Sequence, residues 1–171
     1  MIYRFRITLN GDETTFRDIE IEATDSFEDL HNVILQSFGF DGLEMASFYL
    51  ANEEWEPLEE ITLFDMSEEE ETSKLTMQDS FLEDILHEYQ TRLVYIYDFL
   101  NLWTFKVELA DIAERDPSVD YPNLLFVQGQ LDFGAETEDP ILDENGDSYA
   151  LEDEEGDSYD LFDDPENFQD Y

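Results

Sequence analysis

Large apolar and polar side chains alternate at the start of the chain, as in a strand with one buried face. Between residues 2 and 9 every second side chain is apolar: Tyr3, Phe5, Ile7 and Leu9. The turn sequence Asn10-Gly11-Asp12 separates this stretch from a second one at Phe16–Ala23. We therefore predict that the two stretches form a β-hairpin.

Two later stretches have the three-to-four-residue spacing of amphipathic helices. In Phe27–Phe38 the apolar residues fall on one face, and Ser26-x-x-Asp29 has the pattern of a capping box. Gly39 suits the end of this helix. A second helix is predicted at Asp79–Tyr89, with Ser80-x-x-Glu83 as its capping box.

The remaining apolar stretches predict further strands. Residues 93–97 are apolar on both faces, which is typical of a central strand. Few helices and short connections indicate an α+β fold, in which two helices pack on a mixed, mainly antiparallel sheet within residues 1–130. The other predicted strands are Met45–Ala51, Ile61–Phe64, Trp103–Leu109 and Leu124–Val127.

Net charge narrows the classes of partner. The 171 residues include 47 acidic and seven basic ones, which gives a formal net charge of -40. Phosphate backbones are bound mainly through Lys and Arg, so direct nucleic-acid binding is not expected, and an anionic membrane would repel the chain. The expected partners are basic proteins, with polyamines and weakly associating divalent cations as alternatives. Solubility alone would also account for the charge.

Residues 131–171 differ in composition from the rest of the chain. They contain 17 acidic residues and no basic one, so we expect a disordered, low-complexity tail. Aromatic residues interleaved with the acids predict either a recognition segment that orders on a partner or an anchor to the chain's own sheet edge. These aromatic residues include Phe133, Tyr149, Tyr159, Phe162 and Phe168.

The chain does not contain the residues or motifs that several kinds of chemistry require. The chain has no cysteine, which excludes disulfides, thiolate nucleophiles and Cys-bound metals. No glycine-rich phosphate loop or metal-binding His pattern is present, so no cofactor or metal is expected. The first residues lack the apolar core of a signal peptide, and no apolar run reaches the ~20 residues of a membrane span. The expected location is cytoplasmic.

Residues 2–130 resemble the plasmid pRiA-type ORF-three-like family. The resemblance is carried by the opening strand pair, by Ser26–His31 with its Leu-His pair, and by Leu93–Phe99 followed by Trp103 and Thr104–Leu109. It implies a mixed α/β layer domain. It also implies association with plasmids and mobile elements, with no established reaction.

The chain departs from the family pattern at two places. Leu100-Asn101-Leu102 stands where the family usually has Gly-Asp, and Thr104-Phe105 follows Trp103 where the family has an acidic residue and His. A second family His is absent after the first helix, where the chain reads Asp41–Glu44. If these positions form a polar site in the family, this chain has lost part of it.

His31, Asp98 and Trp103 are the candidate ligand-binding residues. His31 follows the apolar Leu30 on the first predicted helix, where the usual role of such a residue is packing. We predict a non-catalytic protein-interaction domain that binds basic partners through its acidic surface and tail. Two alternatives remain: a nucleic-acid mimic that inhibits a DNA-binding protein, and a small hydrolase-like enzyme with a site near His31 and Asp98.

Overall fold

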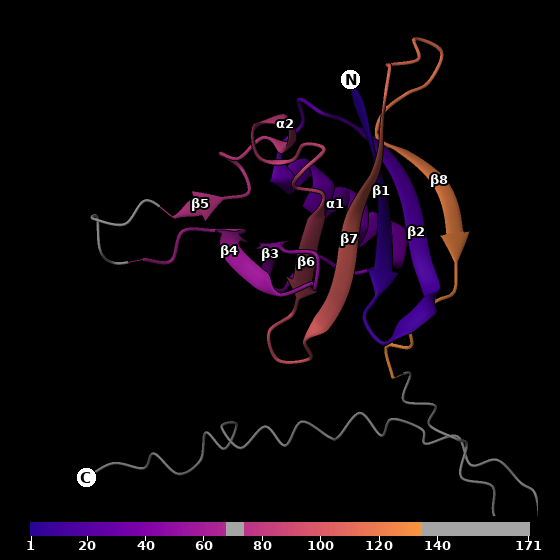
Figure 1. Cartoon of the computed structure of the whole chain (residues 1–171). Helices are drawn as coiled ribbons and strands as arrows, with labels where there is room; N and C mark the ends of the chain where they lie inside the picture. The colour runs from indigo at the N-terminus through magenta and orange to yellow at the C-terminus, as the bar shows by residue number, and fades with distance from the viewer. Residues whose placement is uncertain (68–73, 135–171) are drawn as a thin grey trace, which may run out of the picture. The chain divides into compact units, whose positions relative to one another are not determined.

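One sheet of eight strands organises the part of the chain that the computed structural model describes, residues 1–67 and 74–134 (Figure 1). The elements follow in the order β1 (Ile2–Leu9), β2 (Asp12–Glu22), α1 (Phe27–Phe38), β3 (Ala46–Ala51), β4 (Pro57–Thr62), β5 (Leu75–Thr76), α2 (Leu82–Ile85), β6 (Arg92–Tyr97), β7 (Trp103–Ala113) and β8 (Asn123–Gln128).

The order of strands across the sheet is β5-β4-β3-β6-β7-β1-β2-β8. All neighbouring strands are antiparallel except β4 and β5, which are parallel. β6 lies inside the sheet, between β3 and β7, as its apolar faces predict. The predicted α+β class, with a mixed and mainly antiparallel sheet, is confirmed.

Helix α1 has the bounds and caps that the sequence predicts. The backbone N–H of Asp29 donates to Ser26 Oγ at 3.1 Å, and the Ser26 N–H donates to Asp29 Oδ2 at 2.9 Å. This reciprocal capping box bonds otherwise unpaired backbone donors at the start of the helix. Gly39, with φ 83°, ends the helix in the left-handed conformation that glycine adopts without a Cβ clash.

The second helix is much shorter than predicted. α2 covers only Leu82–Ile85, and its N-cap is Phe81, which makes no side-chain capping bond, so the predicted capping box at Ser80 is wrong. The backbone N–H groups of Leu82 and Glu83 instead donate to the carbonyls of Asp25 and Ala23. These bonds satisfy the first backbone donors of α2, which have no partner within a helix, and the chain becomes extended at Leu86.

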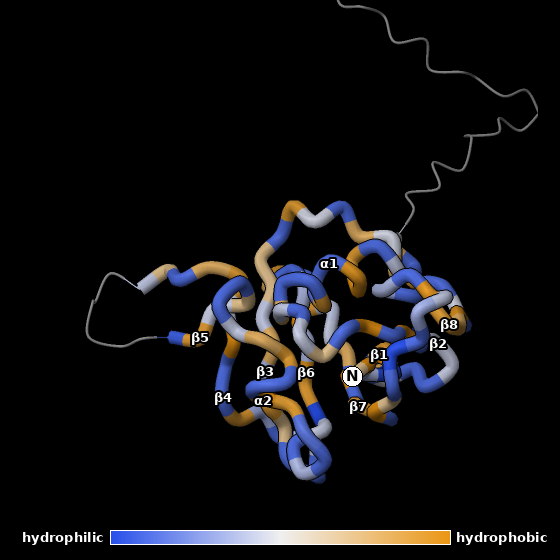
Figure 2. The backbone as a smooth tube through the Cα atoms, turned by 90° about the horizontal axis from the view of Figure 1, so that it is seen from above, coloured by the Kyte–Doolittle hydropathy of each residue, from blue (hydrophilic) through white to orange (hydrophobic). Residues whose placement is uncertain are grey.

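The core lies between α1 and one face of the sheet. Figure 2 shows α1 to one side of the strands. Phe27 of α1 packs edge-on against Phe48 of β3, with ring centroids 5.4 Å apart, and Phe38 packs against Phe105 of β7 at 4.6 Å. The opposite face of the sheet, which we call the open face, carries the polar residues of the alternating strands.

A buried arginine joins three elements at the edge of this core. Arg17 of β2 is buried, and its guanidinium donates to the carbonyls of Ser37, Phe16 and Gln128 at 2.8–2.9 Å. It also lies 4.4 Å from the centre of the Phe38 ring. Burial lowers the pKa of Arg17 because the surroundings solvate the charge less well than water. The contacts connect β2 to the end of α1 and to β8.

Other differences concern strand boundaries. β4 begins at Pro57 rather than at residue 61, and the short β5 was not predicted. The chain divides into two units, Met1–Leu131 and Asp132–Tyr171, and the predicted disorder of the tail lies outside the described residues. In residues 1–67 and 74–134, no helix combines the length and apolar character needed to cross a bilayer.

Candidate functional site

The open face brings charged side chains of three neighbouring strands together. In the sheet register, Arg6 of β1 lies opposite Asp18 of β2 on one side and Glu108 of β7 on the other. Thr8 of β1 lies opposite Lys106 of β7 in the same way. Directly opposed residues point to the same face, so this part of the sheet presents both charge signs to solvent.

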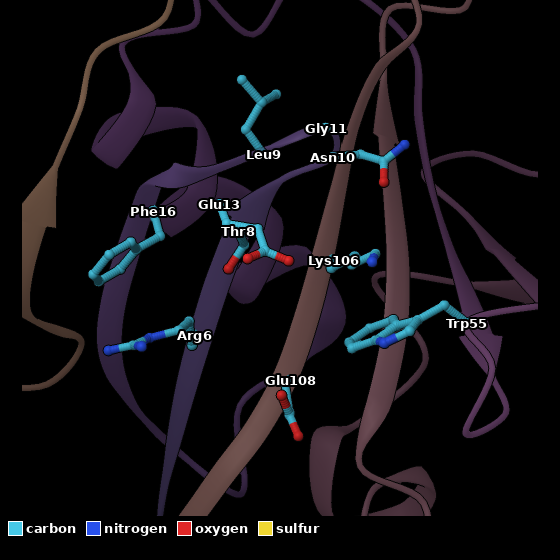
Figure 3. Close-up of a pocket in the computed structure, with 10 residues that line it drawn as sticks. All are labelled: Arg6, Thr8, Leu9, Asn10, Gly11, Glu13, Phe16, Trp55, Lys106 and Glu108. Carbon is cyan, nitrogen blue, oxygen red and sulfur yellow. The ribbon is translucent and has the colours of Figure 1, made fainter.

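A hollow of about 680 Å³ lies on this face (Figure 3). Strands β1, β2 and β7 supply most of its lining, the turn between β1 and β2 supplies Asn10 and Gly11, and the loop between β3 and β4 supplies Trp55. The lining residues are Arg6, Thr8, Leu9, Asn10, Gly11, Glu13, Phe16, Trp55, Lys106 and Glu108.

One wall of the hollow is a cation stacked on an aromatic ring. The guanidinium of Arg6 lies 4.2 Å from the centre of the Phe16 ring. It also donates two bonds of 2.8 Å to the carboxylate of Asp18, a bidentate pair that raises the pKa of Arg6. Arg6 is therefore held in place and is already neutralised by Asp18.

Trp55 forms the opposite wall. Its φ of 63° lies in the left-handed region, which is uncommon for a residue with a large side chain. The Asn52 carbonyl accepts the N–H of Trp55 at 3.1 Å, and Asn52 Oδ1 accepts the N–H of Glu56 at 3.0 Å. This tight turn places the indole within 5.4 Å of both Arg92 and Lys106, a cation–π arrangement.

A second hollow of about 380 Å³ lies beside the first and shares Arg6 and Glu108 with it. Leu125 of β8 also lines it, together with Arg4 and Asp111. Charged and apolar side chains thus line a continuous surface that runs from the Trp55 loop to β8.

The larger hollow carries charged groups of both signs. The larger hollow contains two cations and two carboxylates, Glu13 and Glu108, and neither carboxylate forms an ion pair in the part of the chain that the structure describes. No histidine or cysteine lines it. Within the described ranges, no group of three or more His, Asp or Glu side chains is placed to hold a metal ion.

His31 lies in the core, away from this surface. It is buried on α1, and its Nδ1 atom is 2.8 Å from the hydroxyl oxygen of Tyr95 on β6, within hydrogen-bonding distance. Burial lowers the pKa of His31 from its ordinary value of 6.5 to about 4, and burial also raises the pKa of Tyr95. The imidazole is therefore neutral at pH 7 and packed between α1 and the sheet.

Asp98 shapes the turn between β6 and β7. It has a φ of 60°, and its carboxylate accepts bonds from the N–H groups of Leu100 and Asn101 and from the Asn101 amide at 2.6–3.3 Å. Those bonds lower the pKa of Asp98, with the Asn101 side chain as the main cause. Its oxygens thus bond within the turn between β6 and β7.

Trp103 begins β7, opposite Tyr97 of β6, and its ring centre lies 5.8 Å from that of Phe40. His31 thus bonds to Tyr95 within the core, whereas Asp98 bonds within its own turn. Among the tail residues, Phe133 has a half-exposed side chain. Tyr149, Tyr159, Phe162 and Phe168 lie outside the described residues.

The open-face surface was not predicted as a site. The alternation of Thr104, Lys106 and Glu108 does indicate a wet strand face, but it does not identify the strands beside it. The strand order and the Trp55 turn bring Arg6, Phe16, Lys106 and Trp55 together, and neither can be deduced from local periodicity.

Comparison with known proteins agrees with the fold. A crystal structure of a protein of unknown function from Methanosarcina mazei Go1 superposes with a TM-score of 0.63 at 23% identity, covering 74% of this chain and 68% of that one. No curated protein gives a significant match. The sequence profile of the plasmid pRiA4b ORF-3-like protein matches residues 1–137. The chain therefore belongs to the plasmid pRiA4b ORF-3-like family.

Proposed function

We propose that this chain is a non-catalytic interaction domain that binds basic segments of partner proteins through its acidic surface and its acidic C-terminal tail. The main observation in support is that most Lys and Arg residues of the domain are paired or packed within the fold, whereas most carboxylates of the described residues form no ion pair. A surface of this kind attracts cationic molecules and repels polyanions.

Three arginines are neutralised by carboxylates on neighbouring strands or loops. Arg4 pairs with Glu20 and Asp111, Arg6 pairs with Asp18, and Arg115 pairs with Glu22, all at 2.7–2.9 Å. These are the ion pairs of the described residues, and they use four carboxylates.

Three of the four remaining Lys and Arg residues also have contacts, and the fourth, Lys74, is exposed. Arg17 is buried against backbone carbonyls, while Arg92 and Lys106 lie over Trp55. By contrast, Glu53 and Glu54 in the turn between β3 and β4, and Glu59 on β4, take part in none of the ion pairs formed in residues 1–67 and 74–134. The uncommitted charge of the domain is therefore negative.

The tail adds to the same charge. Residues 135–171 contain 16 acidic residues and no Lys or Arg. Charges of one sign act together over about one Debye length, which is roughly 8 Å at physiological ionic strength. In the proposal, domain and tail attract a basic segment jointly, and the attraction weakens as salt increases.

A defined basic peptide tests this proposal. We expect a fluorescent peptide of repeated Lys-Gly-Ser units to bind the full-length chain, and its affinity to fall about tenfold or more between 50 mM and 500 mM NaCl because salt screens exposed charges. Fluorescence anisotropy measures both affinities. A Gln-Gly-Ser peptide of the same length is the control for charge.

A full-length variant separates the contribution of the tail. It carries Asn for every Asp and Gln for every Glu in residues 135–171, so that length and aromatic residues are unchanged. We expect weaker binding and a smaller salt effect in this variant. The proposal would be contradicted if the Lys peptide did not bind at 50 mM NaCl. It would also be contradicted if the affinity for this peptide did not change with salt.

A further inference from the structure

β8 is the last strand at one edge of the sheet. It pairs with β2 along one side, and no strand of the described residues pairs with its other side. An edge strand presents backbone N–H and C=O groups to which another extended segment can bond. Sheets often bind peptides in this way, by accepting one more strand.

Four consecutive large apolar side chains on β8 are exposed. Leu124, Leu125, Phe126 and Val127 are 46–50% exposed. Single exposed apolar residues are ordinary, but a contiguous group of them on a charged protein marks an interaction surface. The register with β2 shifts between Asp18 and Ile19, which interrupts the regular alternation of β8. Leu125 and Phe126 therefore both lie against the open face.

The two edges of the sheet differ in how they are protected from pairing. β5, at the other edge, has only two residues, and a very short edge strand offers few bonds to a partner. β8 has six residues and contains no Lys, Pro, Asp or Glu, the residues that usually discourage pairing at an edge. The sequence of β8 therefore favours pairing.

Charge selects the kind of segment that would pair there. Asp116 and Asp120 precede β8, Asp132 follows it, and Asp18 lies opposite Phe126 on β2. The nearby Arg115 is already paired with Glu22. A second copy of the chain would carry the same net charge of -40, so Coulomb repulsion opposes self-pairing.

We propose that the free edge of β8 is the docking strand for an extended segment of a partner protein in which apolar residues alternate with Lys or Arg. This inference rests on the function proposed above and identifies β8 as the strand to which the basic partner binds. Backbone bonds to β8 supply affinity, and the side chains on each face supply specificity.

The open face next to β8 can receive the side chains of such a segment. Leu125 lines the hollow of about 380 Å³ that also contains Asp18 and Asp111. Phe126 stacks on Phe16, with ring centroids 5.7 Å apart and planes inclined by 23°. Apolar side chains of the partner pack on Leu125 and Phe126, while its Lys or Arg side chains reach the neighbouring carboxylates.

Leu125→Lys tests the docking edge, with Leu58→Lys as its matched control. Both leucines are exposed, and both lie on strands, but Leu58 is on β4, towards the other edge of the sheet. The probe is a capped peptide of alternating Val and Lys, titrated into the full-length protein. We expect Leu125→Lys to weaken binding about tenfold, because Lys blocks edge pairing and repels the probe, and Leu58→Lys to change it less than about twofold.

Amide hydrogen exchange locates the bound peptide. We expect the peptide to slow exchange in residues 123–128, and a peptide with N-methyl groups on alternate residues to bind weakly because it lacks backbone donors. Thermal unfolding checks that each variant is folded. Leu125→Thr, which keeps a strand-forming residue, should weaken binding in the same direction.

The possible results separate this inference from the proposed function. Equal binding by both Lys variants, or protection at other amides, would overturn the docking edge while the proposed function stands. Binding of neither the Val-Lys peptide nor the Lys-Gly-Ser peptide would overturn both. Protection, without any peptide, of the β8 amides that do not bond to β2 would also overturn the inference. The edge would then be occupied by a second copy or by the chain's own tail, which sedimentation distinguishes.

Discussion

Replacing Arg17 by methionine is expected to lower the free energy of unfolding by about 3 kcal/mol, because the carbonyls of Ser37, Phe16 and Gln128 would lose their side-chain donor. Methionine has a similar length and can still contact Phe38, so the effect reports mainly the lost bonds. Urea denaturation of the purified chain, followed by circular dichroism, measures the change.

Arg6→Met is the matched control for this experiment. Arg6 also lies over a phenylalanine ring and also forms several side-chain bonds, but its ion pair with Asp18 is exposed. Exposed ion pairs contribute about 0–1 kcal/mol, so Arg6→Met should change stability much less. An equal decrease in the free energy of unfolding in the two variants would show that the bonds of Arg17 to buried carbonyls stabilise the fold no more than the exposed ion pair of Arg6.

Acidification is expected to destabilise the folded chain through His31. The folded state disfavours the charged imidazole, so the unfolded chain binds the proton more readily between pH 6.5 and about 4. The contribution of His31 is complete above pH 6.5 and is lost as the pH falls to about 4. A pKa lowered by this amount corresponds to about 3 kcal/mol.

A His31→Gln variant isolates this contribution from the many carboxylates, which titrate in both proteins. Glutamine is neutral at every pH and can keep the bond to Tyr95. We expect the wild type to lose about 3 kcal/mol relative to the variant between pH 7 and pH 4. NMR titration of the His31 ring gives the pKa directly, and a midpoint near 6.5 would contradict the buried, neutral imidazole.

Local sequence patterns predict the elements whose signals agree with one another. α1 has a regular apolar face, a capping box at Ser26 and a glycine at residue 39, and the structure confirms each. The hairpin of β1 and β2 likewise combines alternation with an Asn-Gly turn. In these segments, propensity, periodicity and turn chemistry all favour the same structure.

The α2 segment shows where such patterns fail. Its apolar spacing suits a helix of three turns, yet the chain becomes extended at Leu86, and Phe81 and Tyr89 remain exposed. Backbone bonds to Ala23 and Asp25 and the burial of Leu82 and Leu86 determine the conformation there. These are tertiary contacts, and single-segment periodicity contains no information about them.

The candidate surfaces could be predicted only in part. The sequence predicts a strand at Leu124–Val127, and it predicts that Lys106 lies on the solvent-exposed face of another strand. That β8 lies at an edge, and that Trp55 reaches Lys106, depends on the order of strands across the sheet and on one left-handed turn. The position of His31 was easier to read from the sequence. A histidine next to Leu30 on a helix usually packs in the core, and His31 contacts Tyr95 there.

We propose that this chain binds cationic molecules and not phosphates. The most direct test of this proposal is a side-by-side anisotropy titration of the full-length protein into a labelled Lys-Gly-Ser peptide and a labelled DNA duplex, at physiological ionic strength. We predict saturable binding of the peptide and none of the duplex, because a net charge of -40 repels polyanions. Saturable binding of the duplex under these conditions would contradict the account.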